Sequence, residues 1–135
     1  MWWLRKDPDI LGVDGGRLAP CKRTPNCVSS QADPSDRVHY VTPLWHVGDA
    51  RAAIAAVRAA VAALPRTRIV REDADYLRAE FRSRWMGFVD DVEFLFVPAE
   101  GAIHVRSASR LGRSDFGVNR ARIEAIRGML ANSDN

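Results

Sequence analysis

Residues 76–108 read YLRAEFRSRWMGFVDDVEFLFVPAEGAIHVRSA, and apolar and polar side chains alternate through them in three consecutive runs. The runs cover residues 76–85, 91–97 and 102–108, separated by short links that contain glycine. An alternation with a period of two places one set of side chains on each face of a strand. Because links this short suit hairpins, the three runs predict an antiparallel meander with one apolar face.

The segments before these runs extend the predicted meander and add a helix. Residues 67–72 are expected to form its fourth strand, immediately before the three runs. Residues 49–64 carry apolar side chains at steps of three and four, and Asp49 is a good N-cap, so they predict a helix. Residues 41–47 are typical of a short strand, which Pro43 restricts to an edge or irregular position.

A second helix is predicted near the C-terminal end, with Asn119 as its N-cap. Each helix has one apolar stripe to bury, so both are expected on one face of the sheet. The predicted fold class is α+β: a four- to five-stranded antiparallel sheet in the order β-α-β-β-β-β-α, two helices on one face and a long irregular N-terminal arm. We expect a single domain over residues 1–135, with the arm at 1–40 and the α+β core at 41–132.

Composition narrows the class of protein. The 135 residues are 47% apolar and 27% charged, close to globular averages, and no apolar run is long enough to span a bilayer. The N-terminus has no apolar signal-peptide core, so the expected location is cytoplasmic by default, with export or membrane association as the alternative. A net charge of +3 is too mild to indicate a nucleic-acid partner, although 18 of the 20 basic residues are arginine.

Three local strings stand out: PNCVSS at residues 25–30, DDVEF at 90–94, and a string that starts with RSASR at 106–110 and continues to Arg122. In these strings and their order the chain resembles the domain-of-unknown-function family 1499 (DUF1499) of bacteria and plants. The resemblance extends from about residue 18 to residue 130. It implies no activity, because that family has no established function, so roles for residues must be argued from their chemistry.

The third string predicts a surface that binds anions. A turn with two glycines leads into a helix whose N-terminal N–H groups and dipole favour negative charge. The favoured function is therefore a non-enzymatic module, without cofactor or metal, that binds a small anion or a protein partner. A structural interpretation remains open, in which Arg106, Asp115 and Asn119 form a polar corner. The expected ligand-binding residues are Arg106, Arg110, Arg113, Asp115, Asn119 and Arg120.

An enzyme is the alternative. Cys27 is a candidate nucleophile, with His104 as its base if the arm folds across the polar face of the strand at 102–108. Asp91, Glu93 and His104 are candidate metal ligands for a hydrolase or metal-dependent enzyme. For Asp90 and Asp91, which point to opposite faces of a strand, ion pairs with nearby arginines are favoured over metal binding.

The cysteine pair admits two states. Cys21 and Cys27 are separated by five residues and match no zinc-ribbon spacing. They are expected to form a disulfide if the protein is exported, or to remain reduced in the cytoplasm. In either state we expect both cysteines near one end of the sheet, where they hold the arm.

Overall fold

Four strands form the predicted antiparallel meander in the computed structural model, which describes residues 11–85, 87–111, 115 and 117–133. They are β5 (Thr67–Glu72), β6 (Tyr76–Arg82), β7 (Val89–Val97) and β8 (Ala102–Ser109), and each pairs with the next. In the register, Leu77 lies opposite Phe94, and Phe94 opposite Val105. The apolar members of each alternation therefore share one face, as predicted.

Two shorter strands complete a six-stranded sheet along the edge of β8. β3 (Cys27–Ser29) pairs with residues 106–108, and β4 (Leu44–Trp45) pairs with residues 102–103. The prediction that residues 1–40 are irregular is therefore wrong for β3. A three-residue strand is too short to show an alternation, and only the exposed edge of β8 makes it a strand.

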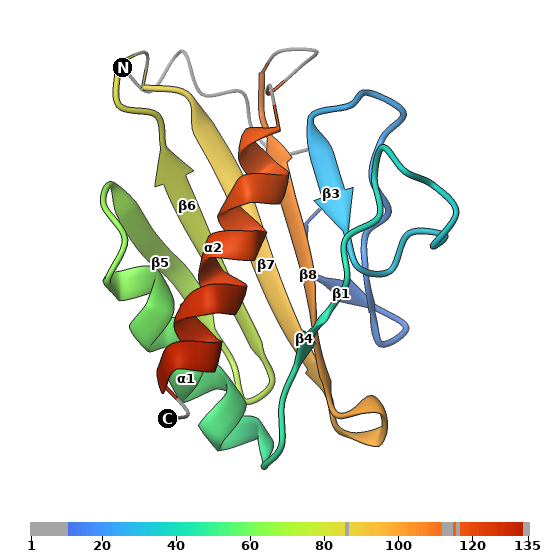
Figure 1. Ribbon diagram of the computed structural model, residues 1–135, viewed down its shortest axis with the longest axis vertical. Coiled ribbons are helices and arrows are strands. Elements are labelled where there is room, and N and C mark those ends of the chain that lie inside the picture. The colour runs from blue at the N-terminus through green and yellow to red at the C-terminus, as the bar shows by residue number, and fades with distance from the viewer. Residues whose placement is uncertain (1–10, 86, 112–114, 116, 134–135) are drawn as a thin grey trace.

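Both helices lie on the same face of the sheet (Figure 1), which confirms the predicted α+β class. α1 (Ala50–Ala62) begins after Asp49, whose side chain accepts the N–H of Ala52 at 2.9 Å. α2 (Val118–Ser133) begins one residue before Asn119. Asn119 is therefore not the N-cap, and its N–H is instead bound by the carboxylate of Asp115 at 3.1 Å.

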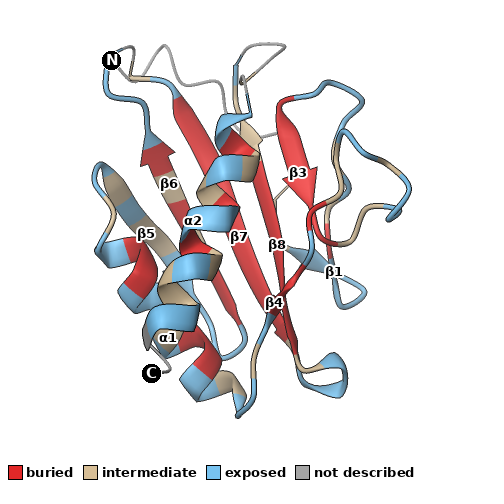
Figure 2. Ribbon diagram, viewed as in Figure 1, coloured by how far each residue is buried: buried red, intermediate tan, exposed pale blue. Residues whose placement is uncertain are grey.

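The core lies between this sheet face and the helices. Phe94 of β7 and Ile103 of β8 are fully buried against Val57 of α1 and Ile123 of α2. Figure 2 shows the central strands buried along their length, while the outer sides of both helices are exposed. None of the described helices is both long and apolar enough to cross a membrane.

The N-terminal arm covers the opposite face of the sheet, which we call the arm-side face. The arm contains a small hairpin of β1 (Val13–Asp14) and β2 (Arg17–Leu18). Leu18 packs there against Tyr76 and Leu95, which project away from the helices. A disulfide joins Cys21 of the arm to Cys27 of β3. The expectation that these cysteines hold the arm is confirmed. The location of the protein, cytoplasmic by default with export as the alternative, remains a prediction.

Candidate functional site

The predicted arginine-rich surface is divided between the two faces of the sheet. Arg106 and Arg110 lie two steps of the strand alternation apart, and both project onto the arm-side face. Arg120 belongs to α2 on the other face, where it donates to the carbonyl of Tyr40 at 2.7 Å. The three arginines therefore do not form one surface, because α2 and the side chains of Arg106 and Arg110 lie on opposite faces of the sheet. Arg113 lies outside the described residues.

Arg106 belongs to a buried cluster with Glu93 and Tyr76. Its Nη1 lies 3.7 Å from Oε1 of Glu93, a carboxylate with an exposed fraction of 0%. The Tyr76 hydroxyl donates to Oε2 of Glu93 at 2.5 Å, and the N–H of Gly12 donates to the same oxygen at 2.7 Å. The cluster attaches the arm to the sheet, because Arg106 also donates to the Pro20 carbonyl at 3.5 Å.

Burial alters the acid–base properties of this cluster. It lowers the pKa of Arg106, with the negative charge of Glu93 acting in the opposite direction. It raises the pKa of Tyr76, and the hydrogen bond to Glu93 raises that pKa further. Oε1 of Glu93 and Nε of Arg106 are buried without a hydrogen-bond partner among the described residues. Two buried polar atoms in this state weaken the pair, since each has lost its hydration without full replacement.

Arg110 is held by two acidic side chains. Its Nε and Nη2 donate to the two carboxylate oxygens of Asp91 at 2.7 and 2.8 Å, and Nη2 also donates to Glu80 at 2.8 Å. The hydrogen bond to Asp91, against the opposing effect of burial, raises the pKa of Arg110. The prediction of an ion pair at Asp91 is confirmed. Because two carboxylates surround it, Arg110 is poorly placed to attract a further anion.

The candidate metal ligands are not brought together. Asp91 binds Arg110, Glu93 binds Tyr76, and His104 lies opposite Leu95, one step further along the sheet than Glu93. In the described part of the chain, no three His, Cys, Asp or Glu side chains are grouped to hold a metal ion. The alternative of a metal site formed by these three side chains is therefore not supported, because strand register separates His104 from Glu93.

The candidate Cys–His pair is also corrected. Cys27 is bonded to Cys21 and presents no thiolate. His104 instead lies between Ser30 and Glu100, with its Nδ1 at 2.9 Å from Ser30 Oγ and its Nε2 at 2.9 Å from Glu100. The Ser30 hydroxyl is buried and accepts the N–H of Val105 at 2.8 Å. It therefore stabilises the sheet edge, where a substrate has little access to it.

A polar corner does exist where β8 turns into α2, but its arginine is Arg122 and not Arg106. Asn119 donates to Asp115 at 2.7 Å and accepts from Ser107 at 2.6 Å and from Arg122 at 2.7 Å. Arg122 also donates to Asp90 at 2.8 Å. Arg106 is excluded because it precedes Ser107 and points to the other face. Asp90 thus forms the predicted type of ion pair, with a partner from α2.

A cavity of about 370 Å³ lies beside this corner. It is at the end of the sheet where the β6–β7 turn and the start of α2 meet, which we call the hairpin end. Arg66, Arg82 and Arg84 line it, together with the Asp90–Arg122 ion pair. Nε of Arg66 donates to the carbonyl of Arg82 at 3.2 Å, which holds these two arginines side by side. We call this cavity the arginine pocket.

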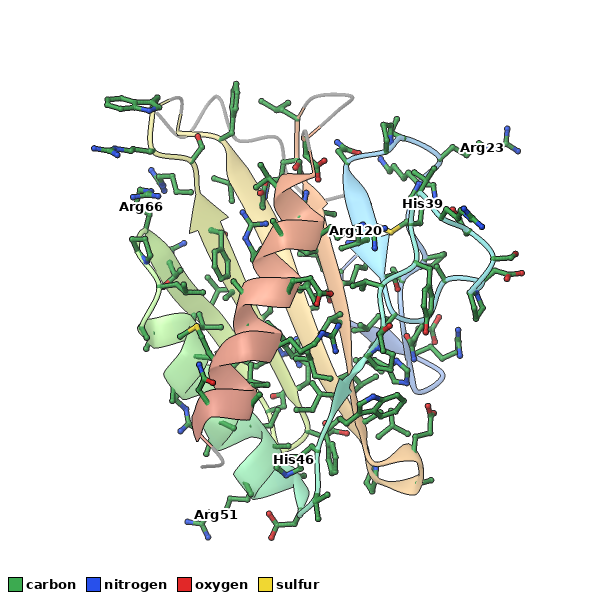
Figure 3. All side chains as sticks on the ribbon, viewed as in Figure 1. Arg23, His39, His46, Arg51, Arg66 and Arg120 are labelled. Atoms are coloured by element: carbon green, nitrogen blue, oxygen red, sulfur yellow. A yellow bond between two sulfur atoms is a disulfide. The ribbon has the colours of Figure 1, made fainter. Side chains whose placement is uncertain are left out.

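The three exposed arginines give the arginine pocket an excess of positive charge. None of them has an acidic partner within the described residues, whereas Asp90 is already paired with Arg122. Figure 3 shows Arg66 near this end of the sheet and Arg51 near the opposite end. The lining of the pocket therefore carries positive charge, and guanidinium groups bind oxyanions through paired N–H donors.

A second cavity, of about 390 Å³, lies in the arm. Its basic lining residues include Arg17, and Asp33 and Asp36 also line it. Both acids are held in the charged form: hydrogen bonds from Ser35 lower the pKa of Asp33, and those from His39 lower the pKa of Asp36. Because these carboxylates offset the basic groups, this cavity favours an anion less than the arginine pocket does.

A family model described as "Protein of unknown function (DUF1499)" matches residues 17–130. This chain belongs to the DUF1499 family. The resemblance inferred from the three sequence strings is confirmed. No curated protein matches the chain. Since the family description assigns no function, the function of this DUF1499 protein must be argued from the site itself.

The three strings that carry the DUF1499 resemblance meet at the polar corner. From the first string, Asn26 accepts an amide N–H of Asn119 at 3.3 Å and the backbone N–H of Ser109 at 3.0 Å. From the second, Asp90 binds Arg122. The third supplies Asn119, Ser109 and Arg122 themselves. Segments far apart in the sequence therefore form one hydrogen-bonded network next to the arginine pocket.

Sequence reasoning missed the arginines that line the pocket. Arg82 and Arg84 were visible as polar members of the alternation at 76–85, but nothing indicated that they end beside α2. Arg66 has a φ of 58°, in the left-handed region that favours glycine. A basic residue directly after Pro65, in the turn between a predicted helix and strand, was the one available signal.

Proposed function

We propose that this DUF1499 chain is a binding module for a small oxyanion, such as a phosphate or carboxylate group, and that the arginine pocket holds it. The observation that carries the proposal is the grouping of Arg66, Arg82 and Arg84 around one cavity without an acidic partner among the described residues. The proposal retains the anion-binding function that the sequence predicts, but it assigns the function to the arginines of the pocket in place of Arg106, Arg110 and Arg120.

The polar corner supports the proposal by shaping one wall of the pocket. Arg122 stacks over the ring of Phe81 at 4.6 Å while its N–H groups bind Asp90, Asn119 and Ser107. Those contacts fix Arg122 and neutralise Asp90. The three exposed arginines are left to contact a ligand, and their flexible side chains can adjust to phosphate or carboxylate geometry.

Titration with inorganic phosphate at constant ionic strength tests the proposal. Wild type is expected to bind phosphate, and each of Arg82→Ala and Arg84→Ala is expected to weaken binding by about five- to tenfold, since each loses a charge-assisted contact. Arg51→Ala is the matched control, because Arg51 is an exposed arginine of α1 outside the pocket. Equal weakening by Arg51→Ala, or no binding by folded wild type, would contradict the proposal.

Arg66→Gly separates binding from stability. Glycine adopts the positive φ of this turn without strain, so the free energy of unfolding should stay within about 1 kcal/mol of wild type or rise. Phosphate binding should still weaken, because one guanidinium is lost. A variant that melts like wild type and binds phosphate equally well would remove Arg66 from the proposed site.

A further inference from the structure

Two aromatic side chains are exposed at the hairpin end, in the turn between β6 and β7. Trp85 has an exposed fraction of 81% and Phe88 of 38%. Val118, which lines the arginine pocket at the start of α2, is also exposed. Large apolar side chains in water are unfavourable, and several of them gathered at one end of a protein indicate an interaction surface.

The charge next to these aromatic residues is positive. The guanidinium of Arg84 stacks over the ring of Trp85 at 4.7 Å, and Arg82 lies two residues earlier on the same strand end. Neither arginine has an acidic partner among the described residues. The surface thus combines apolar rings with unpaired cations within a few residues of chain.

The opposite end of the sheet provides an internal comparison. Trp45 of β4 has an exposed fraction of 67%, and Val47 beside it is also exposed. The neighbouring charges there include Asp49, the N-cap of α1, and Glu100 in the β7–β8 turn. Both ends expose a tryptophan, but among the described residues the hairpin end groups three arginines without an acidic partner, whereas the opposite end has Arg51 near Asp49. Apolar exposure alone therefore does not distinguish the hairpin end; its charge does.

An anionic membrane surface fits this combination. Tryptophan is favoured at the boundary between lipid headgroups and acyl chains, and arginine binds lipid phosphates. Each basic residue near an anionic membrane contributes about a fivefold gain in binding. We propose that the hairpin end docks on an anionic phospholipid surface, with Trp85 and Phe88 in the interface and a lipid phosphate in the arginine pocket. This inference rests on the proposed anion-binding function and names its ligand.

The docked protein would lie on the membrane without crossing it. Trp85, Phe88, Arg82 and Arg84 belong to one turn and its flanking strand ends, which reach only the interfacial region. Because two kinds of contact attach the protein, vesicle binding should depend separately on the salt concentration and on the aromatic side chains. Binding should weaken with added salt through the arginines, and it should weaken at any salt concentration when the aromatic rings are removed.

Co-sedimentation of the 135-residue chain with vesicles tests the proposal. Wild type should bind vesicles of phosphatidylcholine mixed with phosphatidylglycerol, and should bind phosphatidylcholine vesicles at least about tenfold more weakly. Trp85→Ala should weaken binding to the anionic vesicles at least about fivefold. Trp45→Ala is the matched control and should bind like wild type. Equal loss in both tryptophan variants, or failure of folded wild type to bind anionic vesicles, would overturn the proposal.

Inorganic phosphate distinguishes this inference from the function on which it rests. Trp85→Ala should retain wild-type phosphate binding while losing vesicle binding, because Trp85 adds interface contact and does not line the pocket. If wild type binds phosphate but not anionic vesicles, the membrane inference is wrong and the proposed function stands. If size-exclusion chromatography shows a self-associated form that Trp85→Ala abolishes, the hairpin end binds a second copy, which also overturns the inference.

Discussion

On the arm-side face, Arg106 and Arg110 lie against buried carboxylates, whereas at the hairpin end Arg82 and Arg84 lie exposed without an acidic partner among the described residues. Burial makes the first pair structural, because an ion removed from water needs a partner to compensate its lost hydration. Exposure leaves the second pair hydrated and free to exchange water for a ligand. The same residue type therefore stabilises the fold in one region and is suited to binding in the other.

The largest expected effect tests the arm-side half of this comparison. Arg110→Ala should lower the free energy of unfolding by about 3–5 kcal/mol, because it leaves Asp91 buried and unpaired. Urea denaturation measures the loss. Arg68→Ala is the control, since exposed Arg68 contacts Glu80, the other partner of Arg110, at 3.1 Å. It should cost less than about 1 kcal/mol, and a cost equal to that of Arg110→Ala would break the comparison.

Alkaline pH tests the buried cluster of Tyr76, Glu93 and Arg106. Burial and the hydrogen bond to Glu93 raise the folded-state pKa of Tyr76 above its unfolded value near 10. The unfolded chain then loses its proton first, so this stabilisation is complete below pH 10 and decreases above it. The expected slope approaches about 1.4 kcal/mol per pH unit. Unfolding measured from pH 9 upwards should show this slope in wild type and a reduced slope in Tyr76→Phe; identical slopes would contradict it.

The disulfide tests how strongly the arm is attached to the arm-side face. The double variant Cys21→Ser, Cys27→Ser should remain folded and lose about 2 kcal/mol, because the bond closes only a short loop. Thermal unfolding of the variant and of oxidised wild type measures this loss, and reduced wild type should unfold like the variant. Complete loss of folding would show that the arm is essential to the core, contrary to its small share of the apolar cluster against the helices, to which it contributes Val28.

The smallest expected effect on stability concerns the hairpin end. The double variant Arg82→Ala, Arg84→Ala should change the free energy of unfolding by less than about 0.5 kcal/mol, since both side chains are exposed and form no ion pair with a described residue. A loss of several kcal/mol would make these arginines structural and remove the contrast with Arg110. Unchanged stability together with weakened phosphate binding would strengthen the contrast between these exposed arginines and buried Arg110.

Local patterns were sufficient for most of the fold. The period-two alternation located the four meander strands, and helical spacing with Asp49 as N-cap located α1. These signals are readable because each element buries one regular face. β3 was missed because three residues show no period, and the start of α2 lies two residues earlier than predicted because Asp115 binds the first-turn N–H group. β3 depends on β8, which is distant in the sequence, and the start of α2 depends on Asp115, which precedes the helix.

The sequence by itself determined which side chains share a sheet face: Asp91, Glu93, His104 and Arg106 lie on the face opposite the core, as the alternation requires. Only the tertiary structure decided their partners. Strand register separates His104 from Glu93. The packing of α2 on the sheet places Arg122 beside Asp90, with which it forms an ion pair. The arginine pocket likewise depends on three turns meeting at one end of the sheet. Periodicity is a local property of the chain, whereas register and helix placement are set by packing of the whole core.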